Sequence, residues 1–215
     1  MLRWLPLLLL LAACGGSPEQ PETAPEPAPS PKQSSATPTP SPAPSTATTR
    51  KPKPPEKADP RWRFFTDDTT RHTSPWFAGR RRVMIGYGCT PAPYYDHDSR
   101  CPDNQGFHHG IDVAMPCGTR LFSAVRGTVD PTASGSPGSA YGERPFRIRT
   151  DSHDVLIGHA RRVLVESGEQ VHPRQRIALA SDSGAPDGCH LHFEVRRHGG
   201  GVSAAVNPAG LLQLT

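Results

Sequence analysis

The sequence predicts a mostly β fold, in which a small antiparallel sheet follows a long disordered segment. Short runs rich in β-branched and aromatic residues recur from about Asp59 onward, and glycine-containing turns separate them. Helical periodicity is scarce in that region, whereas proline, serine and threonine dominate the residues before it. The 215-residue chain therefore has room for one domain of about 150 residues and an N-terminal tail.

Residues 1–13 have the character of a secretory signal peptide. Met1-Leu2-Arg3 is positively charged, and residues 5–13 form an apolar stretch that is too short to cross a membrane. This stretch leads into Cys14 in a way that resembles the lipobox of bacterial lipoproteins, whose cysteine is lipidated and becomes the mature N-terminus. We expect lipidation of Cys14. An ordinary signal peptide with an incidental cysteine, or an N-terminal core strand, is the alternative.

Residues 14–58 are the lipidated cysteine and the expected linker. The linker contains no aromatic residue and consists mainly of proline, serine, threonine, alanine, glutamate and lysine. Such a segment buries too little apolar surface to offset the entropy of ordering it, so we expect disorder. At roughly 3.1 Å per residue, about 44 proline-rich residues could reach on the order of 130 Å. The linker is therefore expected to act as a tether or a plain spacer.

Residues 59–215 form the expected folded domain. The predicted strands cover 83–85, 111–114, 121–125, 146–149, 155–157, 176–180 and 191–195. Before residue 107, we expect an edge strand at 83–88 and a loop rich in proline, tyrosine and aspartate between Cys89 and Cys101.

Four cysteines remain in this domain after Cys14: Cys89, Cys101, Cys117 and Cys189. An even number in an exported domain favours two disulfides. We pair Cys89 with Cys101 because they bracket one loop, which leaves Cys117 with Cys189, although the sequence alone admits three pairings. The rival interpretation is a four-cysteine zinc site, but the chain has no Cys-x-x-Cys spacing.

Two histidine clusters carry the candidate chemistry. In the run 189–195, Cys-His-Leu-His-Phe-Glu-Val, alternation places His190 and His192 on one face of a strand. In the run 107–114, His108 and Asp112 are four residues apart, which keeps both on one face if the run is extended. Two imidazoles and one carboxylate suit a tetrahedral zinc ion with an open fourth position. Each motif alone is more often structural than metal-binding.

Together the two clusters resemble the signatures of the lysostaphin-like (LytM-type) zinc peptidases. The resemblance runs from His108 to Pro208 and includes HHGIDVAMPCGTRLFSAVRGTV, ESGEQVHPRQRIALASDSGAPDGCHLHFEV and the closing Val-Asn-Pro. It implies a small antiparallel β-sheet domain (the lysostaphin-like, duplicated hybrid motif fold) with a substrate groove. It also implies one zinc ion per chain, at the floor of that groove.

The resemblance also assigns roles to individual residues. It makes His108, Asp112 and His192 the zinc ligands. It gives His159 and His190 to catalysis, without deciding which of them is the base.

Some positions depart from these assignments. The family usually has Tyr-x-His-Leu where this chain has Ile-Gly-His-Ala at 157–160, which concerns contacts with substrate rather than the chemistry. Glu194 has no catalytic part in the family, and we expect it to support the ligands. The remaining histidines are expected to be surface or structural: His72, His97, His109, His153, His172 and His198.

The implied activity is zinc-dependent hydrolysis of peptide bonds in peptidoglycan stems or cross-links by a monomer. The expected partners are peptidoglycan peptides, a membrane reached through the lipid anchor, and other cell-wall hydrolases. The expected location is the cell envelope, facing the periplasm or the cell wall. The outer membrane is favoured, because Gly15 replaces the aspartate associated with inner-membrane retention. A net charge of +4 without a basic run interleaved with aromatics argues against nucleic acid.

Two other functional classes remain open. The family includes members that have lost ligands and regulate other hydrolases, so a non-catalytic module that binds cell wall and activates a partner hydrolase is the main alternative. Occupation of all five expected positions favours an enzyme. A structural envelope lipoprotein that only holds zinc is the third class, and it would not require His159 or His190.

Overall fold

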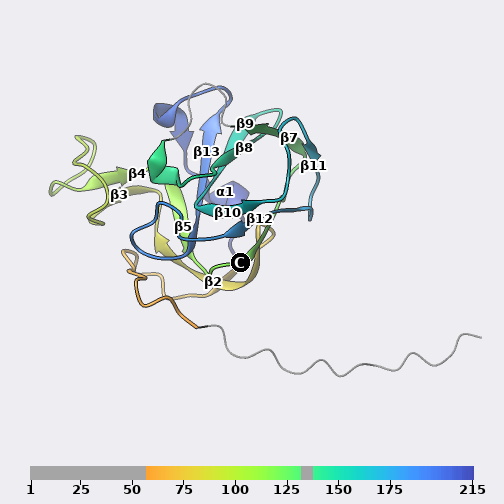
Figure 1. The fold of residues 1–215 in the computed structure, drawn as a ribbon. Helices are drawn as coiled ribbons and strands as arrows, with labels where there is room; N and C mark the ends of the chain where they lie inside the picture. Colours follow the sequence, from red (N-terminus) through yellow and green to blue (C-terminus); the bar gives the residue numbers. More distant parts are fainter. Residues whose placement is uncertain (1–56, 132–137) are drawn as a thin grey trace, which may run out of the picture. The chain divides into compact units, whose positions relative to one another are not determined.

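The computed structural model describes residues 57–131 and 138–215, which belong to one unit dominated by antiparallel strands (Figure 1). The expected signal peptide at 1–13, Cys14 and nearly all of the expected linker lie outside the described residues. Within the described part, no helix is long and apolar enough to cross a lipid bilayer.

The described residues contain fourteen strands and three short helices. The strands are β1 (His72–Ser74), β2 (Phe77–Ile85), β3 (Gly88–Thr90), β4 (Gly106–His108), β5 (Gly110–Ala114), β6 (Arg120–Phe122), β7 (Gly127–Pro131), β8 (Phe146–Arg149), β9 (His153–Gly158), β10 (Ala160–Val163), β11 (Gln170–Val171), β12 (Arg176–Ala180), β13 (His190–Arg197) and β14 (Ala205–Val206). The helices are η1 (Ser139–Tyr141), η2 (Val202–Ala204) and α1 (Ala209–Leu212). Each of the seven predicted strands corresponds to one of these, although the strand expected at 121–125 ends at Phe122.

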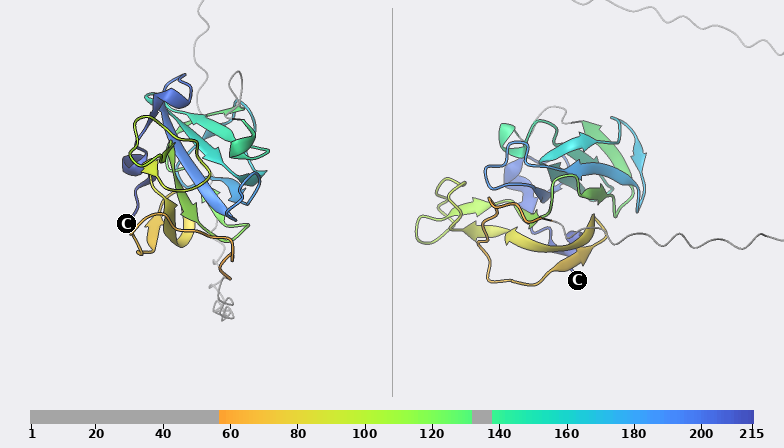
Figure 2. Two further views of the ribbon diagram at one scale, coloured as in Figure 1. Left: turned by 90° about the vertical axis from the view of Figure 1, so that its left-hand side faces the viewer. Right: turned by 60° about the horizontal axis from the view of Figure 1, so that its bottom comes forward.

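Strand β13 lies at the centre of the main sheet. The strands follow the order β10-β12-β6-β2-β5-β13-β9-β8-β7-β11, with β1 beside β2 and β14 beside β13, whereas β3 and β4 form a separate ribbon. Every pairing within this sheet is antiparallel, which confirms the predicted fold class. The right-hand view of Figure 2 shows the sheet curling over, with the yellow strand β2 below and the blue-green strands above it.

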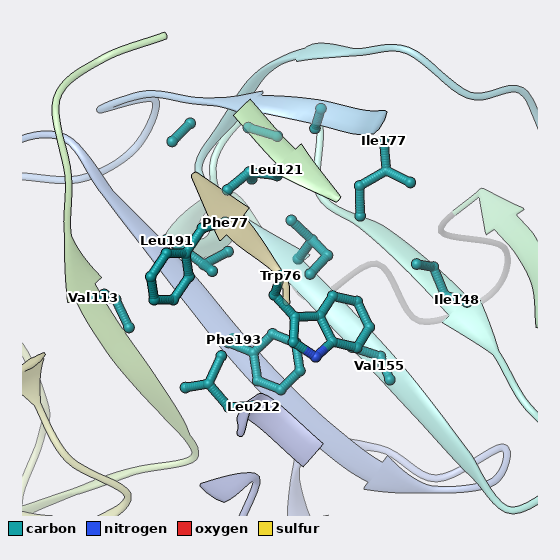
Figure 3. Close-up of a cluster of buried hydrophobic side chains, with 14 of the residues drawn as sticks. Trp76, Phe77, Val113, Leu121, Ile148, Val155, Ile177, Leu191, Phe193 and Leu212 are labelled. Atoms are coloured by element: carbon teal, nitrogen blue, oxygen red, sulfur yellow. The ribbon is translucent and has the colours of Figure 1, made fainter. Parts of the chain in front are cut away.

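The main core lies against one face of β13. Leu191, Phe193 and Val195 alternate along the strand and all join this core. The ring of Phe193 meets Trp76 edge-on, with 4.7 Å between ring centroids, and Figure 3 shows both beside Leu212 of α1. The opposite face of β13 is also buried, and it carries the polar side chains described below.

The strand expected at 83–88 ends earlier, at Ile85. Strand β2 lies between β5 and β6, but its residues 83–85 pair with β5 alone, because β6 pairs with β2 only at Phe77. A second apolar cluster covers this segment, and in it Met84 and Ile85 pack against Trp62 and Phe65 from the start of the domain. The Trp62 indole Nε1 also donates to the carbonyl oxygen of Cys189 at 2.7 Å, so this segment supports the chain just before β13.

The structure contains the disulfides Cys89–Cys101 and Cys117–Cys189, the two pairs favoured in the sequence analysis. The first closes the loop between β3 and β4. The second joins the loop after β5 to the residue before His190, and it therefore ties together two segments that flank the polar face of β13.

Candidate metal centre

Three side chains from neighbouring strands converge on the polar face of β13. His108 ends β4, Asp112 lies in β5 and His192 lies in β13 directly opposite Asp112. One potential ligand atom from each residue lies within 4.8 Å of the other two, and all three side chains are buried. The structure therefore brings together the three residues that the resemblance implies as ligands.

The run from His108 to Asp112 is not a single strand, contrary to the simplest expectation. Strand β4 pairs with β3, whereas β5 pairs with β2 and β13. The extended structure is interrupted at His109, which lies between the two strands. The two side chains still meet, with His108 Nε2 3.4 Å from Asp112 Oδ1. His108 Nδ1 donates to the carbonyl oxygen of Gly86 at 2.9 Å, so the lone pair of Nε2 faces the cluster.

Both ring nitrogens of His192 face carboxylates. Nδ1 lies 2.9 Å from Asp112 Oδ1, and Nε2 lies 3.2 Å from Glu194 Oε2. Burial alone lowers the pKa of His192, but the two carboxylates outweigh burial and raise it to about 9. The ring packs tightly over Gly110, because a Cβ atom at that position would lie 2.7 Å from His192 Cε1.

Glu194 is itself held by two side chains. The Tyr141 hydroxyl donates to Glu194 Oε2 at 2.7 Å, Arg196 Nε donates to Oε1, and Arg196 Nη2 donates to the Tyr141 oxygen at 3.2 Å. Burial opposes ionisation of Glu194, but His192 and Arg196 lower its pKa to about 2. The supporting position of Glu194 was expected from the sequence, whereas Tyr141 and Arg196 were not. Tyr141 lies 53 residues away in the chain and belongs to no motif.

His190 presents an unpaired nitrogen next to this cluster. Its Nδ1 donates to the carbonyl oxygen of Gly188 at 2.9 Å, and because a carbonyl only accepts, Nε2 carries the lone pair of the neutral ring. Among the described residues, Nε2 has no hydrogen-bond partner. It lies 3.7 Å from Asp112 Oδ1, and the side chain is buried.

His159 is oriented in the same way. Its Nδ1 donates to the carbonyl oxygen of Ser183 at 2.7 Å, which again leaves the lone pair at Nε2. Its ring lies 4.3 Å from the His190 ring, measured between centroids. Burial, reinforced by His190 and His192, lowers the pKa of His159 to about 3, so this ring is neutral near pH 7. The backbone is fixed at φ 52°, where the Ser181 amide and hydroxyl both donate to the His159 carbonyl oxygen.

A groove with a volume of about 240 Å³ opens beside the two histidines. Tyr94 and Tyr95 line it, so the Cys89–Cys101 loop forms part of its wall. The Tyr95 hydroxyl lies 3.5 Å from Asp112 Oδ2. Asp187, from the turn before β13, also lines the groove. No spacing or motif in the sequence singles out these tyrosines or Asp187.

Other potential ligands do not join the centre. Cys117, Asp182 and Cys189 lie close together, but the two cysteines form a disulfide and offer no thiolate. His109 packs on Phe107, and its Nε2 lies 3.4 Å from Arg100. The remaining histidines lie outside both groups of potential ligands in the described part of the chain: His72, His97, His153, His172 and His198.

The three residues fit a zinc ion by their chemistry. Two imidazole nitrogens and a carboxylate oxygen are ligand types that zinc accepts in sites with an open position. Metal-binding histidines also tend to engage their second nitrogen with a carbonyl or carboxylate. His108 does so with Gly86, and His192 does so with Glu194.

Comparison with known proteins shows what the region around this centre resembles. Residues 106–208 match Peptidase family M23. The chain is 38% identical over 100 residues to a lipoprotein NlpD/LppB homolog of Pseudomonas aeruginosa, a match that covers 46% of this chain and 33% of that protein. It is 31% identical over 97 residues to the peptidoglycan DD-endopeptidase ShyA of Vibrio cholerae, covering 45% of this chain and 22% of that protein. The matched region thus spans a third or less of these two relatives.

The fold is shared with a solved structure. The antimicrobial peptidase lysostaphin from Staphylococcus simulans aligns with a TM-score of 0.51 and 22% identity, covering 67% of this chain and 55% of that chain. The antiparallel lysostaphin-like fold expected from the sequence is confirmed.

Proposed function

We propose that this chain, whose residues 106–208 match Peptidase family M23, is a zinc-dependent endopeptidase that hydrolyses peptide bonds in peptidoglycan stems or cross-links. The observation that carries the proposal is the position of His190. Its unpaired Nε2 lies beside the group formed by His108, Asp112 and His192, and the residue lines an open groove. A centre that only held a metal would not need a second pair of oriented histidines.

The proposed ligands are His108, Asp112 and His192. A zinc ion bound by them supplies polarisation of a carbonyl group and a lowered pKa for a water molecule. Asp112 brings one negative charge, and the two histidines bind as neutral rings. Glu194 accepts a hydrogen bond from His192 Nε2, which leaves Nδ1 of this ring for the metal.

Proton transfer is assigned to His159 and His190. Each ring donates from Nδ1 to a backbone carbonyl, so each can accept a proton only at Nε2. One of the pair accepts the proton of the attacking water and then passes it to the leaving amine, while the other stabilises the developing oxyanion. If the carbonyl group of a bound peptide lies beside both Nε2 atoms, the proton can be accepted and passed on without a change in the orientation of either ring.

The substrate class rests on two supports. The peptidoglycan DD-endopeptidase ShyA shares 31% identity with this chain over 97 residues. The groove of about 240 Å³ beside His159 and His190 is lined by residues of the Cys89–Cys101 loop and of the turn before β13, and it offers a place for part of a peptide. The proposed location is the cell envelope, through a lipid on Cys14. Labelling with a fatty acid, with Cys14→Ser as the control, tests that anchor.

Digestion of purified cell wall tests the activity. The full chain, loaded with zinc, is incubated with cell-wall preparations, and the released fragments are identified by mass spectrometry. We expect shortened or uncross-linked peptides that disappear when a chelator is added. Folded, zinc-loaded chain that releases nothing contradicts the peptidase and favours the alternative, a module that activates a partner hydrolase.

A further inference from the structure

Asp187 places a carboxylate in the wall of the groove, next to the proposed proton-transfer pair. Its side chain is 3% exposed, and it lines the same cavity as His159 and His190. Burying a carboxylate costs free energy unless a positive group or hydrogen bonds compensate it. Burial accordingly raises the pKa of Asp187, although His190 acts in the opposite direction.

The buried Asp187 carboxylate is not compensated by a hydrogen bond from His190. The distance from Asp187 Oδ1 to His190 Nδ1 is 3.5 Å, which is longer than a normal hydrogen bond. The proton on Nδ1 is already donated to the carbonyl oxygen of Gly188 at 2.9 Å. The orientation of the His190 ring is therefore set by the backbone of its own turn. The Asp187 carboxylate is supported by its own backbone N–H rather than by a charged hydrogen bond, so it can still accept one from a substrate.

The groove is otherwise suited to a positive group. Its lining among the described residues includes two carboxylates, Asp112 and Asp187, and neither lysine nor arginine. Asp112 belongs to the proposed metal ligands, so Asp187 is the negative charge that remains for a substrate. Tyr94 and Tyr95 line the same cavity, and aromatic rings attract cations through their faces.

We propose that Asp187 forms a subsite for an ammonium group that the substrate carries close to the scissile bond. The inference rests on the proposed peptidase function and names a feature of its substrate: a peptide with a free amine, either on the side chain of a diamino residue or at an amino terminus. A carboxylate in a partly dry groove binds such a group strongly, because hydrogen bonds to charged partners are stronger than neutral ones.

Matched peptides test the subsite. Cross-linked peptides purified from cell wall are offered to the full chain with their free amines intact or acetylated, and both turnover and binding are measured. Wild type is expected to favour the free amine by about tenfold or more in kcat/KM and in binding affinity, the size expected for one charged hydrogen bond. Asp187→Asn is expected to bring this preference close to one. Synthetic peptides acetylated only on the side chain or only at the amino terminus identify which of the two amines Asp187 binds.

Asp182→Asn is the matched control. Asp182 lies in the same turn region and is half-exposed, but its carboxylate binds Arg61 at 2.7 Å and does not line the groove. This variant should keep the wild-type preference for the free amine.

The outcomes separate the subsite from the peptidase. Cleavage without preference for the free amine, or equal losses on both peptides in Asp187→Asn, overturns the subsite and leaves the peptidase standing. A binding preference that Asp187→Asn removes, in the absence of any cleavage, supports the subsite and contradicts the peptidase. Equal or absent binding of both peptides, without cleavage, overturns the subsite as well.

Discussion

Glu194 lies two residues beyond His192 on β13, and its Oε2 atom is 3.2 Å from His192 Nε2. The side chains share one face of the strand because residues i and i+2 point the same way. A single strand therefore carries a proposed ligand together with the carboxylate that orients it. Tyr141 and Arg196 then hold that carboxylate in place.

This relationship predicts that Glu194→Gln weakens metal binding. Loss of the carboxylate removes the charged acceptor for His192 Nε2 and leaves Arg196 with the Tyr141 hydroxyl but without its negatively charged partner. Partners of this kind change metal affinity by about 10- to 100-fold. Competition for zinc with a chromophoric chelator measures the change.

Tyr141→Phe is the graded control for that variant. It keeps the ring, which packs 4.9 Å from the His192 ring, and removes only the hydroxyl. We expect a smaller loss of zinc affinity than in Glu194→Gln, together with a loss of about 1 kcal/mol in the free energy of unfolding. Wild-type zinc affinity in a folded Glu194→Gln protein would contradict the supporting role.

Gly110→Ala should destabilise the domain. The added Cβ would lie 2.7 Å from His192 Cε1 and 2.8 Å from the Phe193 carbonyl oxygen, so the packed strands would have to move apart. Overpacking of this kind costs about 1–3 kcal/mol, measurable by urea unfolding. Gly210→Ala in α1 is the control, because nothing lies within 4 Å of its Cβ position. A neutral Gly110→Ala would mean that the His192 ring is not confined as described.

Zinc should raise the melting temperature of chain from which metal has been removed. A ligand that binds only the folded state stabilises it by about 2.7 kcal/mol at a concentration 100 times its Kd. His108→Ala should lose this response, since the proposed site would lose a ligand. His109→Ala should retain it, because His109 contacts Phe107 and Arg100 instead. Loss of the zinc response in both variants would argue against the assigned ligand set.

Phe193→Ala should be among the more damaging core substitutions. Phe193 is fully buried against Trp76, and truncation of a buried phenylalanine costs about 3–5 kcal/mol. Val202→Ala is the control, because Val202 is 47% exposed and such positions usually change stability by less than about 0.5 kcal/mol. Denaturant midpoints compare the two, and similar values would contradict the placement of the core.

The local pattern of the sequence was sufficient to predict the strand that carries the centre. The alternation of His190, Leu191, His192 and Phe193 has the period of a strand, and both faces of β13 are used as this pattern indicates. The four-residue offset between His108 and Asp112 correctly predicted that their side chains meet. The reason given for it, a single extended strand, was incomplete. Their side chains meet across a break between two strands, which local periodicity does not encode.

The parts that escaped prediction depend on contacts between distant segments. Trp62 and Phe65 pack over Met84 and Ile85 of β2, and no property of 83–88 alone reveals that cover. Tyr141 reaches the centre from a helix between the two recognised signatures, and Asp187 reaches it from a turn within the second signature, to which the resemblance assigns no role. Their types and spacing are common in surface loops, so the sequence gives no reason to select them.

The most direct test of the central claim compares wild type with His190→Ala at equal zinc content. Both proteins are loaded with zinc, the metal is quantified by mass spectrometry, and the release of peptides from purified cell wall is measured on the same samples. We predict one zinc ion per chain in each protein and a loss of at least 100-fold in the rate of peptide release for the variant, the scale of general acid–base catalysis. Equal rates at equal zinc content would contradict the account, because the unpaired Nε2 of His190 would then have no part in the reaction.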